Sequence, residues 1–244
     1  MSTAWHRNWS TAVPASSSAT DAGALLAALQ HGDSFFPSGA IAFSWGLETL
    51  RADGAVAAAD DVERFIAGQL AGRWATLDRP ALLAAHRRAA APDEGAAVDA
   101  ELEALALARE TREGSRRAGA ALLGVHERLG TPGAAAYRQR VRAGSAPGHL
   151  AIVQGMMWRA AGLGETAAAA ASAHALCTGQ LGAALRLGLI GHVEAQRILA
   201  ALRPEICRIL AEPPPPVGAW RAFTPAADIA VMRHETATVR LFAN

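Results

Sequence analysis

A histidine and a glutamate stand side by side near the C-terminus and could take part in metal chemistry. His234 and Glu235 match the first half of the H-E-x-x-H motif, in which two histidines one turn apart bind zinc and the glutamate acts as a general base. The second histidine is replaced by Thr238, so the ligand set is incomplete. The pattern therefore does not support a metalloprotease.

A second candidate metal site pairs His174 with Cys177. The two residues are three positions apart on a predicted helix, so they share a face and could bind nickel or zinc. Two ligands do not complete a site, however. A cysteine packed in the core beside a hydrogen-bonded histidine explains the same spacing.

The absence of lysine excludes several enzyme classes. All 23 residues counted as lysine or arginine are arginines, which rules out a P-loop and a Schiff-base mechanism. Nucleophile-elbow, redox and dinucleotide-binding motifs are absent as well. We therefore expect a protein that is not an enzyme and has no cofactor of its own.

The charge and hydropathy of the sequence indicate which partners and which location to expect. The net charge of +1 comes from 23 basic and 22 acidic residues without a long block of either sign, so we expect no nucleic-acid partner. Residues 167–190 are apolar but contain His174, Gln180 and Arg186, which favours a core helix and no membrane span. Two cysteines and no signal-peptide pattern predict a cytoplasmic protein.

The segment Asp33–Glu48 is apolar yet cannot be one regular helix. Pro37 lacks a backbone donor and Gly39 tolerates positive φ, while the aromatic residues around them are too hydrophobic for an exposed loop. The segment predicts a covered corner. Glu48 at its end, and Arg186 in the later apolar helix, must each be paired, lie at the surface or meet a partner.

Helical periodicity predicts an all-α, single-domain bundle of about ten helices. We expect a flexible leader over residues 1–20, a helical domain over 21–212, and a proline spacer with a partner-binding tail over 213–244. Within the tail, Thr224 and Pro225 open a short helix with Asp228 in its first turn. The predicted helices are Ala22–His31, Ile41–Ala52, Asp60–Leu77, Arg79–Ala90, Asp93–Arg109, Glu110–Leu129, Pro132–Arg142, Gly148–Ala161, Glu165–Leu189 and His192–Ala211.

Several segments, in order along the chain, resemble the urease accessory proteins called UreF. They include Asp33-Ser-x-x-Pro-x-Gly-x-x-Ala-Phe-Ser-x-Gly-Leu-Glu48, Arg109-Glu-x-x-x-x-Ser115, and the tail Pro225-x-x-Asp228-x-x-x-Met232-Arg-His-Glu235 continuing to Arg240-Leu-Phe242. The chain departs from the family pattern at Ile41 and His192. These departures affect local contacts only.

The resemblance implies an all-helical assembly factor for urease. Such a protein joins UreD, also called UreH, and the GTPase UreG in a GTP-dependent chaperone complex that inserts nickel into apo-urease, and it is typically a homodimer. Nickel and GTP are then handled by the complex. The alternative is a metallochaperone that itself carries nickel, through His174 and Cys177 or through the histidines near the tail.

The resemblance also implies two sets of partner contacts. Glu48 and Arg186 are expected to contact UreG or to gate nickel flow. The residues expected to bind UreD are Asp228, Met232, Arg233, His234, Glu235, Arg240, Leu241 and Phe242.

Overall fold

The computed structural model describes residues 17–33, 36–37, 43–235 and 241–242. Within these ranges the chain contains no β-strand, and its helices share one hydrophobic core, so the predicted all-α bundle is confirmed. The predicted flexible leader, residues 1–20, lies mostly outside the described residues and stays a prediction. The elements are α1 (Ser17–Gly32), α2 (Leu47–Ala52), α3 (Ala59–Gln69), the π-helix η2 (Leu70–Asp78), α4 (Arg79–Arg87), α5 (Pro92–Leu105), α6 (Arg109–Arg128), α7 (Ala134–Arg142), α8 (Leu150–Ala160), α9 (Glu165–Arg186), α10 (His192–Ala211) and α11 (Pro225–His234).

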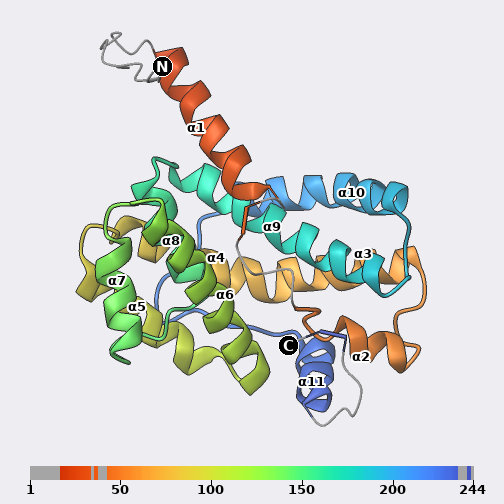
Figure 1. Cartoon of the computed structure of the whole chain (residues 1–244). Coiled ribbons are helices and arrows are strands. Elements are labelled where there is room, and N and C mark those ends of the chain that lie inside the picture. The colour runs from red at the N-terminus through yellow and green to blue at the C-terminus, as the bar shows by residue number, and fades with distance from the viewer. Residues whose placement is uncertain (1–16, 34–35, 38–42, 236–240, 243–244) are drawn as a thin grey trace, which may run out of the picture.

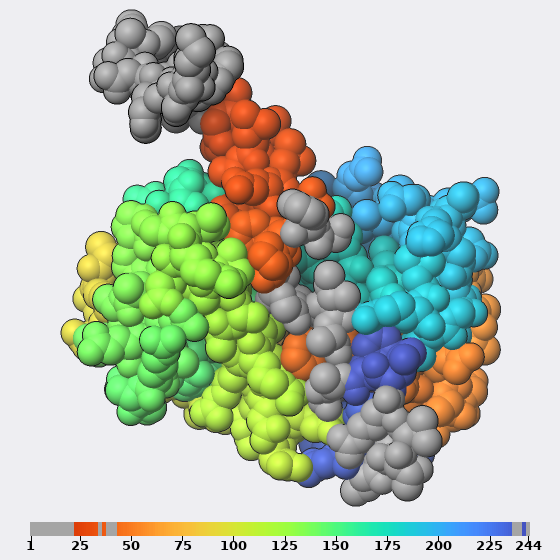
Figure 2. All heavy atoms as spheres, viewed as in Figure 1, coloured from red at the N-terminus to blue at the C-terminus, as the bar shows by residue number. Residues whose placement is uncertain are grey.

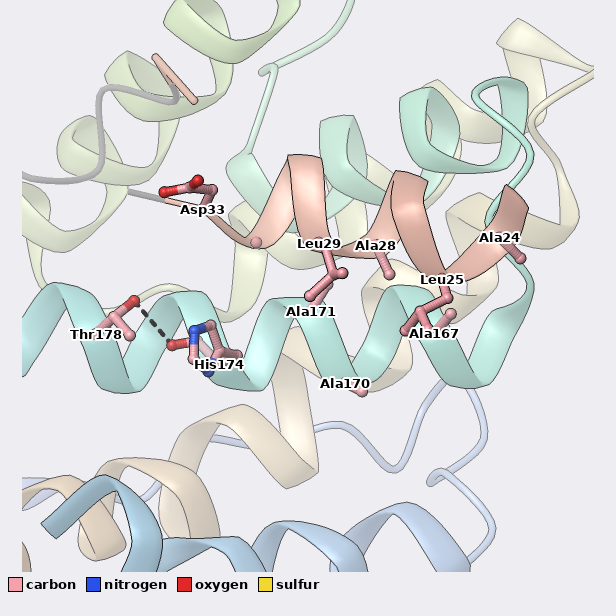
Figure 3. A pocket seen from close by; sticks show the side chains of 11 residues that line it. Ala24, Leu25, Ala28, Leu29, Asp33, Ala167, Ala170, Ala171, His174 and Thr178 are labelled. Carbon is pink, nitrogen blue, oxygen red and sulfur yellow. Dashed lines mark hydrogen bonds between the residues drawn. The ribbon is translucent and has the colours of Figure 1, made fainter. Parts of the chain in front are cut away.

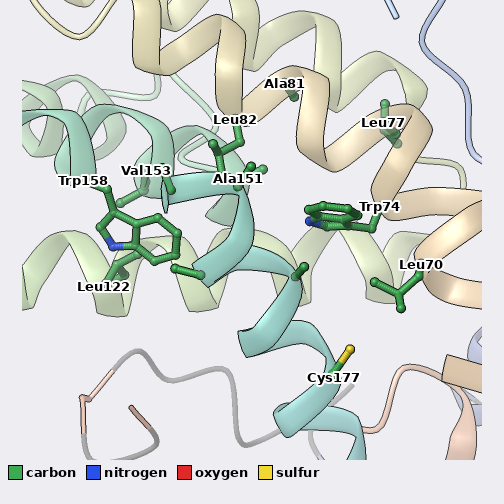
Figure 4. Packing of buried hydrophobic residues seen from close by; sticks show 14 of the residues in the cluster. Leu70, Trp74, Leu77, Ala81, Leu82, Leu122, Ala151, Val153, Trp158 and Cys177 are labelled. Carbon is green, nitrogen blue, oxygen red and sulfur yellow. The ribbon is translucent and has the colours of Figure 1, made fainter. Parts of the chain in front are cut away.

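The body is built around α8 and α9 (Figure 1). α8 packs against α4 and α6, and α9 packs against α1, α8 and α10. Trp74, Trp158 and Leu122 are at most 2% exposed and fill the space between these helices (Figure 4). Among the described residues, no helix combines the length and apolarity needed to cross a membrane.

Two glycines let helices approach more closely than any side chain would allow. A Cβ atom on Gly155 in α8 would lie 2.2 Å from the carbonyl oxygen of Leu82 in α4. A Cβ on Gly119 in α6 would lie 2.0 Å from the carbonyl oxygen of Gly148. Real Cβ atoms do not come this close to oxygen, so backbone contact at Gly155 and Gly119 sets the spacing of α4, α6 and α8.

The predicted helix Asp60–Leu77 is two elements rather than one, which corrects the sequence-based expectation. Regular α-helix ends at Gln69, and the π-helical turns of η2 follow. The carbonyl oxygens of Gly72 and Thr76 accept hydrogen bonds from the amides of Phe223 (2.8 Å) and Arg221 (3.1 Å). The π-helix therefore holds the chain that leads into α11.

Two helix starts also differ from the prediction. α3 begins at Ala59, one residue before the predicted start, and is capped by Asp61, whose carboxylate accepts hydrogen bonds from the amides of Ala57 (2.9 Å) and Ala58 (3.0 Å). The helix predicted from Ile41 begins at Leu47. The reason is the positive φ of the residues that precede Leu47, which no α-helix can contain.

A buried pair of imidazoles joins α1 to the body. The rings of His31 and His126 stack with centroids 5.2 Å apart, and His31 also contacts the ring of Phe36. Nδ1 of His126 bonds the hydroxyl of Thr131 at 2.9 Å. Burial, reinforced by the neighbouring His31, lowers the pKa of His126 from 6.5 to about 4, and burial also lowers the pKa of His31.

This pair predicts a loss of stability in mild acid. Between pH 6.5 and about 4 the unfolded chain binds a proton at His126 that the folded chain excludes, so the free energy of unfolding decreases as the pH falls. Urea unfolding should show a decrease of about 2 kcal/mol between about pH 7.5 and pH 5. His126→Phe should flatten this slope; an equal slope in the variant would contradict the assignment.

Candidate functional site

The corner before α2 aims Glu48 at the C-terminal tail. Trp45 and Gly46 have φ of 54° and 91°, a left-handed turn that ends the incoming chain and starts α2 at Leu47. Glu48 lies in the first turn of α2 and its own amide contacts the hydroxyl of Ser44. A carboxylate near a helix N-terminus is favoured by the helix dipole.

α11 packs directly on this corner. Thr224 and Pro225 open the helix as predicted, with Asp228 in its first turn, where the Thr224 hydroxyl donates to the Asp228 carboxylate at 3.1 Å. A Cβ added to Gly46 would lie 2.9 Å from the carbonyl oxygen of Ala227, so the two backbones touch. The inner face of the helix consists of buried residues: Ala227, Ala230, Val231 and His234.

Glu48 holds the residues at the end of the tail. Its Oε1 accepts the amide of Leu241 at 2.7 Å, and its Oε2 accepts the amide of Phe242 at 3.2 Å and lies 3.1 Å from Nε2 of His234. The guanidinium of Arg186, at the end of α9, lies 4.3 Å above the ring of Phe242. We call Glu48, Arg186, His234, Leu241 and Phe242 the tail clamp.

The tail residues divide into an inner and an outer set. His234 and Phe242 are buried, whereas Met232 and Leu241 are 47% and 61% exposed. The outer residues are therefore the ones available to a partner.

Ion pairs anchor the sides of the tail. Arg233 pairs with Asp53 at the end of α2, and Glu235 pairs with Arg109 at the start of α6. Arg240 lies outside the described residues.

The structure brings together two sets of residues that the sequence kept apart. Glu48 and Arg186 were assigned to one partner and the tail to another, but they contact each other within one chain. Sequence reasoning missed Glu110, which faces His234, and Asp53, which holds Arg233. Glu110 stands in one of the family-like segments and could have been singled out there; nothing in the sequence marks Asp53.

His174 and Cys177 lie in different surroundings. His174 is exposed and lines a groove of about 700 Å³ between α1 and α9 (Figure 3). Cys177 is 0% exposed in the core (Figure 4), and burial raises the pKa of its thiol to about 12. A thiol that stays protonated is a poor metal ligand. In the described part of the chain, no three His, Cys, Asp or Glu side chains gather in a way that could hold a metal ion.

The groove belongs to the most prominent surface feature of the molecule. α1 stands out from the body (Figure 2), and its Leu25, Leu26 and Leu29 are 60–66% exposed. Alanines of α9, among them Ala167 and Ala170, form the opposite wall. In the view of Figure 1, α1 rises above the body, whereas α11 lies at its lower edge.

Comparison with known proteins identifies the family. The UreF family model matches residues 56–203. The chain is 34% identical over 235 residues to a protein of Trichodesmium erythraeum named urease accessory protein UreF, covering 92% of this chain and 99% of the relative. The chain belongs to the UreF family. Proteins of the same name from Rhizobium leguminosarum and Cereibacter sphaeroides are also 34% identical, over 85% and 90% of this chain and 90% and 98% of their own lengths.

The match to the UreF family model includes only part of the tail clamp. The family model includes Arg186 but stops short of Glu48 on one side and of α11 on the other. The Trichodesmium relative aligns with 92% of the chain, which is far more than the family model matches. The clamp of this UreF chain therefore combines a residue of the matched core with segments on either side of it.

Proposed function

We propose that this protein is a non-enzymatic assembly factor that acts in the cytoplasm, in a GTP-dependent complex with UreD and UreG, to insert nickel into apo-urease. Membership in a family of urease accessory proteins supports a role in urease maturation. The absence of lysine assigns the nucleotide chemistry of such a complex to a partner. We also propose a homodimer, which the mass of the free protein in solution tests.

The observation that carries the proposal is the division of the tail into an inner and an outer set. Met232 and Leu241 are two large apolar side chains of the tail that are exposed, as the anchors of a partner-binding surface would be. The inner residues His234 and Phe242 contact Glu48, and Phe242 also contacts Arg186. A surface that is ordered before binding loses less conformational entropy when a partner docks.

The same geometry changes what Glu48 and Arg186 are expected to do. Both are engaged by the tail of their own chain, so a direct contact with UreG is not required to explain them. We propose that they support UreG recruitment through the position of the tail. Arg186 lies on α9, which also carries the groove, and so connects the clamp to the body.

The proposal predicts that charges on the outer face abolish the UreD contact. Met232→Glu combined with Leu241→Glu should reduce co-purification with UreD at least 100-fold, because two apolar anchors are replaced by desolvated charges. The variant should unfold at the same temperature as the native protein, since both side chains are exposed. Removing the whole tail is a poorer test, because it would also uncover Gly46 and the core beneath α11.

Leu129→Glu is the matched control. Leu129 is 60% exposed at the far end of α6 and takes no part in the tail. UreD binding that survives the double substitution in Met232 and Leu241 would refute the role of the tail. A loss that Leu129→Glu reproduces would show that the effect is one of surface charge alone.

A further inference from the structure

Glu110 is a buried carboxylate beside the tail clamp. It lies in the first turn of α6 and is 6% exposed. Its Oε2 lies 3.4 Å from Nδ1 of His234, the ring nitrogen that does not face Glu48. Glu110 thus approaches the clamp from a third helix.

The imidazole of His234 lies between two carboxylates. Nε2 is 3.1 Å from Glu48 on α2, and Nδ1 faces Glu110 on α6. The side chains of His234, Glu110 and Glu48 are 1%, 7% and 17% exposed. The two ring nitrogens of an imidazole face opposite sides, so one ring can contact two side chains at once. Polar groups in a desolvated site need such contacts.

Arginines surround the bridge. Arg109 pairs with Glu235 and also interacts electrostatically with Glu110, and Arg233 pairs with Asp53. Arg186 lies over the ring of Phe242. The imidazole of His234 is the side chain that lies directly between Glu48 and Glu110.

We propose that Glu110 is a positioning residue for the tail. It holds the His234 imidazole against Glu48, and this contact orients the Glu48 carboxylate so that its oxygens accept the amides of Leu241 and Phe242. The bridge from Glu110 through His234 to Glu48 joins α6, α11 and α2. Its effect on the tail stands by itself; its effect on UreD binding rests on the proposed function.

Hydrogen exchange of the full-length protein tests the bridge directly. The readout is the C-terminal peptide that contains the amides of Leu241 and Phe242. In Glu110→Gln, which keeps the size of the side chain, these amides should exchange about tenfold faster or more, the size of effect expected when a charge-assisted contact is lost. Peptides of α8 should exchange as in the native protein.

Two further variants sharpen the test. His234→Gln should accelerate the exchange of the same amides. Combining it with Glu110→Gln should add little, because each change alone already removes the contact between Glu110 and His234. Glu127→Gln is the control: Glu127 lies on the same helix α6 but pairs with Arg138 on α7. It should leave the tail amides unchanged.

Each outcome decides the matter. Unchanged exchange of the tail amides in Glu110→Gln overturns the proposal. If Glu110→Gln also accelerates exchange in the α8 peptides, the free energies of unfolding of Glu110→Gln, His234→Gln and the double variant are compared. Losses of stability that simply add in the double variant overturn the proposal. Faster tail exchange with undiminished UreD binding supports the bridge and refutes the tail contact in the proposed function, so the two ideas fail separately.

Discussion

Gly155→Ala is expected to lower the free energy of unfolding by about 3 kcal/mol or more, the upper part of the range for overpacked cores. The added methyl group would lie 2.2 Å from the carbonyl oxygen of Leu82 and 3.0 Å from the amide nitrogen of His86. Both neighbours are backbone atoms of α4, which cannot rotate away as a side chain can. α4 and α8 must therefore separate, and the packing of the core around them loosens.

Gly182→Ala is the matched control for this substitution. Gly182 lies inside α9, as Gly155 lies inside α8, but nothing approaches within 4 Å of the position its Cβ would take. Alanine should stabilise this helix by about 0.5–1 kcal/mol, because it has the higher helix propensity. Urea or thermal unfolding measures both variants. Equal stability of Gly155→Ala and the native protein would show that α4 and α8 have room for a methyl group between them.

Glu48→Ala should release the tail and with it the binding of UreD. The substitution removes the acceptor of two backbone amides and leaves His234 beside one carboxylate instead of two. A buried donor that loses its hydrogen-bond partner typically costs about 1–3 kcal/mol. We expect UreD co-purification to fall at least 100-fold and α11 to become sensitive to proteolysis.

The control and the second partner make this test specific. Glu165→Ala removes a carboxylate that pairs with Arg87 at the opposite end of α9 from Arg186, and it should leave both partners bound. Pull-down with UreG is measured in parallel. Loss of UreG alone, with UreD retained, would return Glu48 to the role that the sequence pattern assigned it, a direct contact with the GTPase.

The helices could be predicted from sequence because their apolar residues recur with the helical period. Val62, Ile66 and Leu70 form one stripe and all three are fully buried. The same stripe continues through Trp74 and Leu77, which explains why the π-helix went unnoticed. A π-turn changes the register by one residue and depends on where its carbonyls find donors. Here the donors are the amides of Arg221 and Phe223, far along the chain.

The members of the candidate site were largely predictable, but their arrangement was not. Glu48 and Arg186 stood out as charges within apolar sequence, and the tail stood out for its apolar anchors. Glu48, Arg186, His234, Leu241 and Phe242 form the clamp. The other described tail candidates, Asp228, Met232, Arg233 and Glu235, lie outside it. Their mutual contact could not be derived from spacing, because long-range pairing leaves no periodic signal. Cys177 illustrates the opposite case: its spacing from His174 suggested a ligand pair, and only burial separates them.

The contact between Glu48 and Leu241 joins positions 193 residues apart. During synthesis the early helices emerge first, and the corner around Glu48 cannot close until the last residues of the tail leave the ribosome. Until then the surfaces that α11 will cover remain open to water or to chaperones. Completion of this corner is therefore a late step in folding, slowed by the high sequence separation of its contacts, and a chain truncated within the tail would stay in that unfinished state.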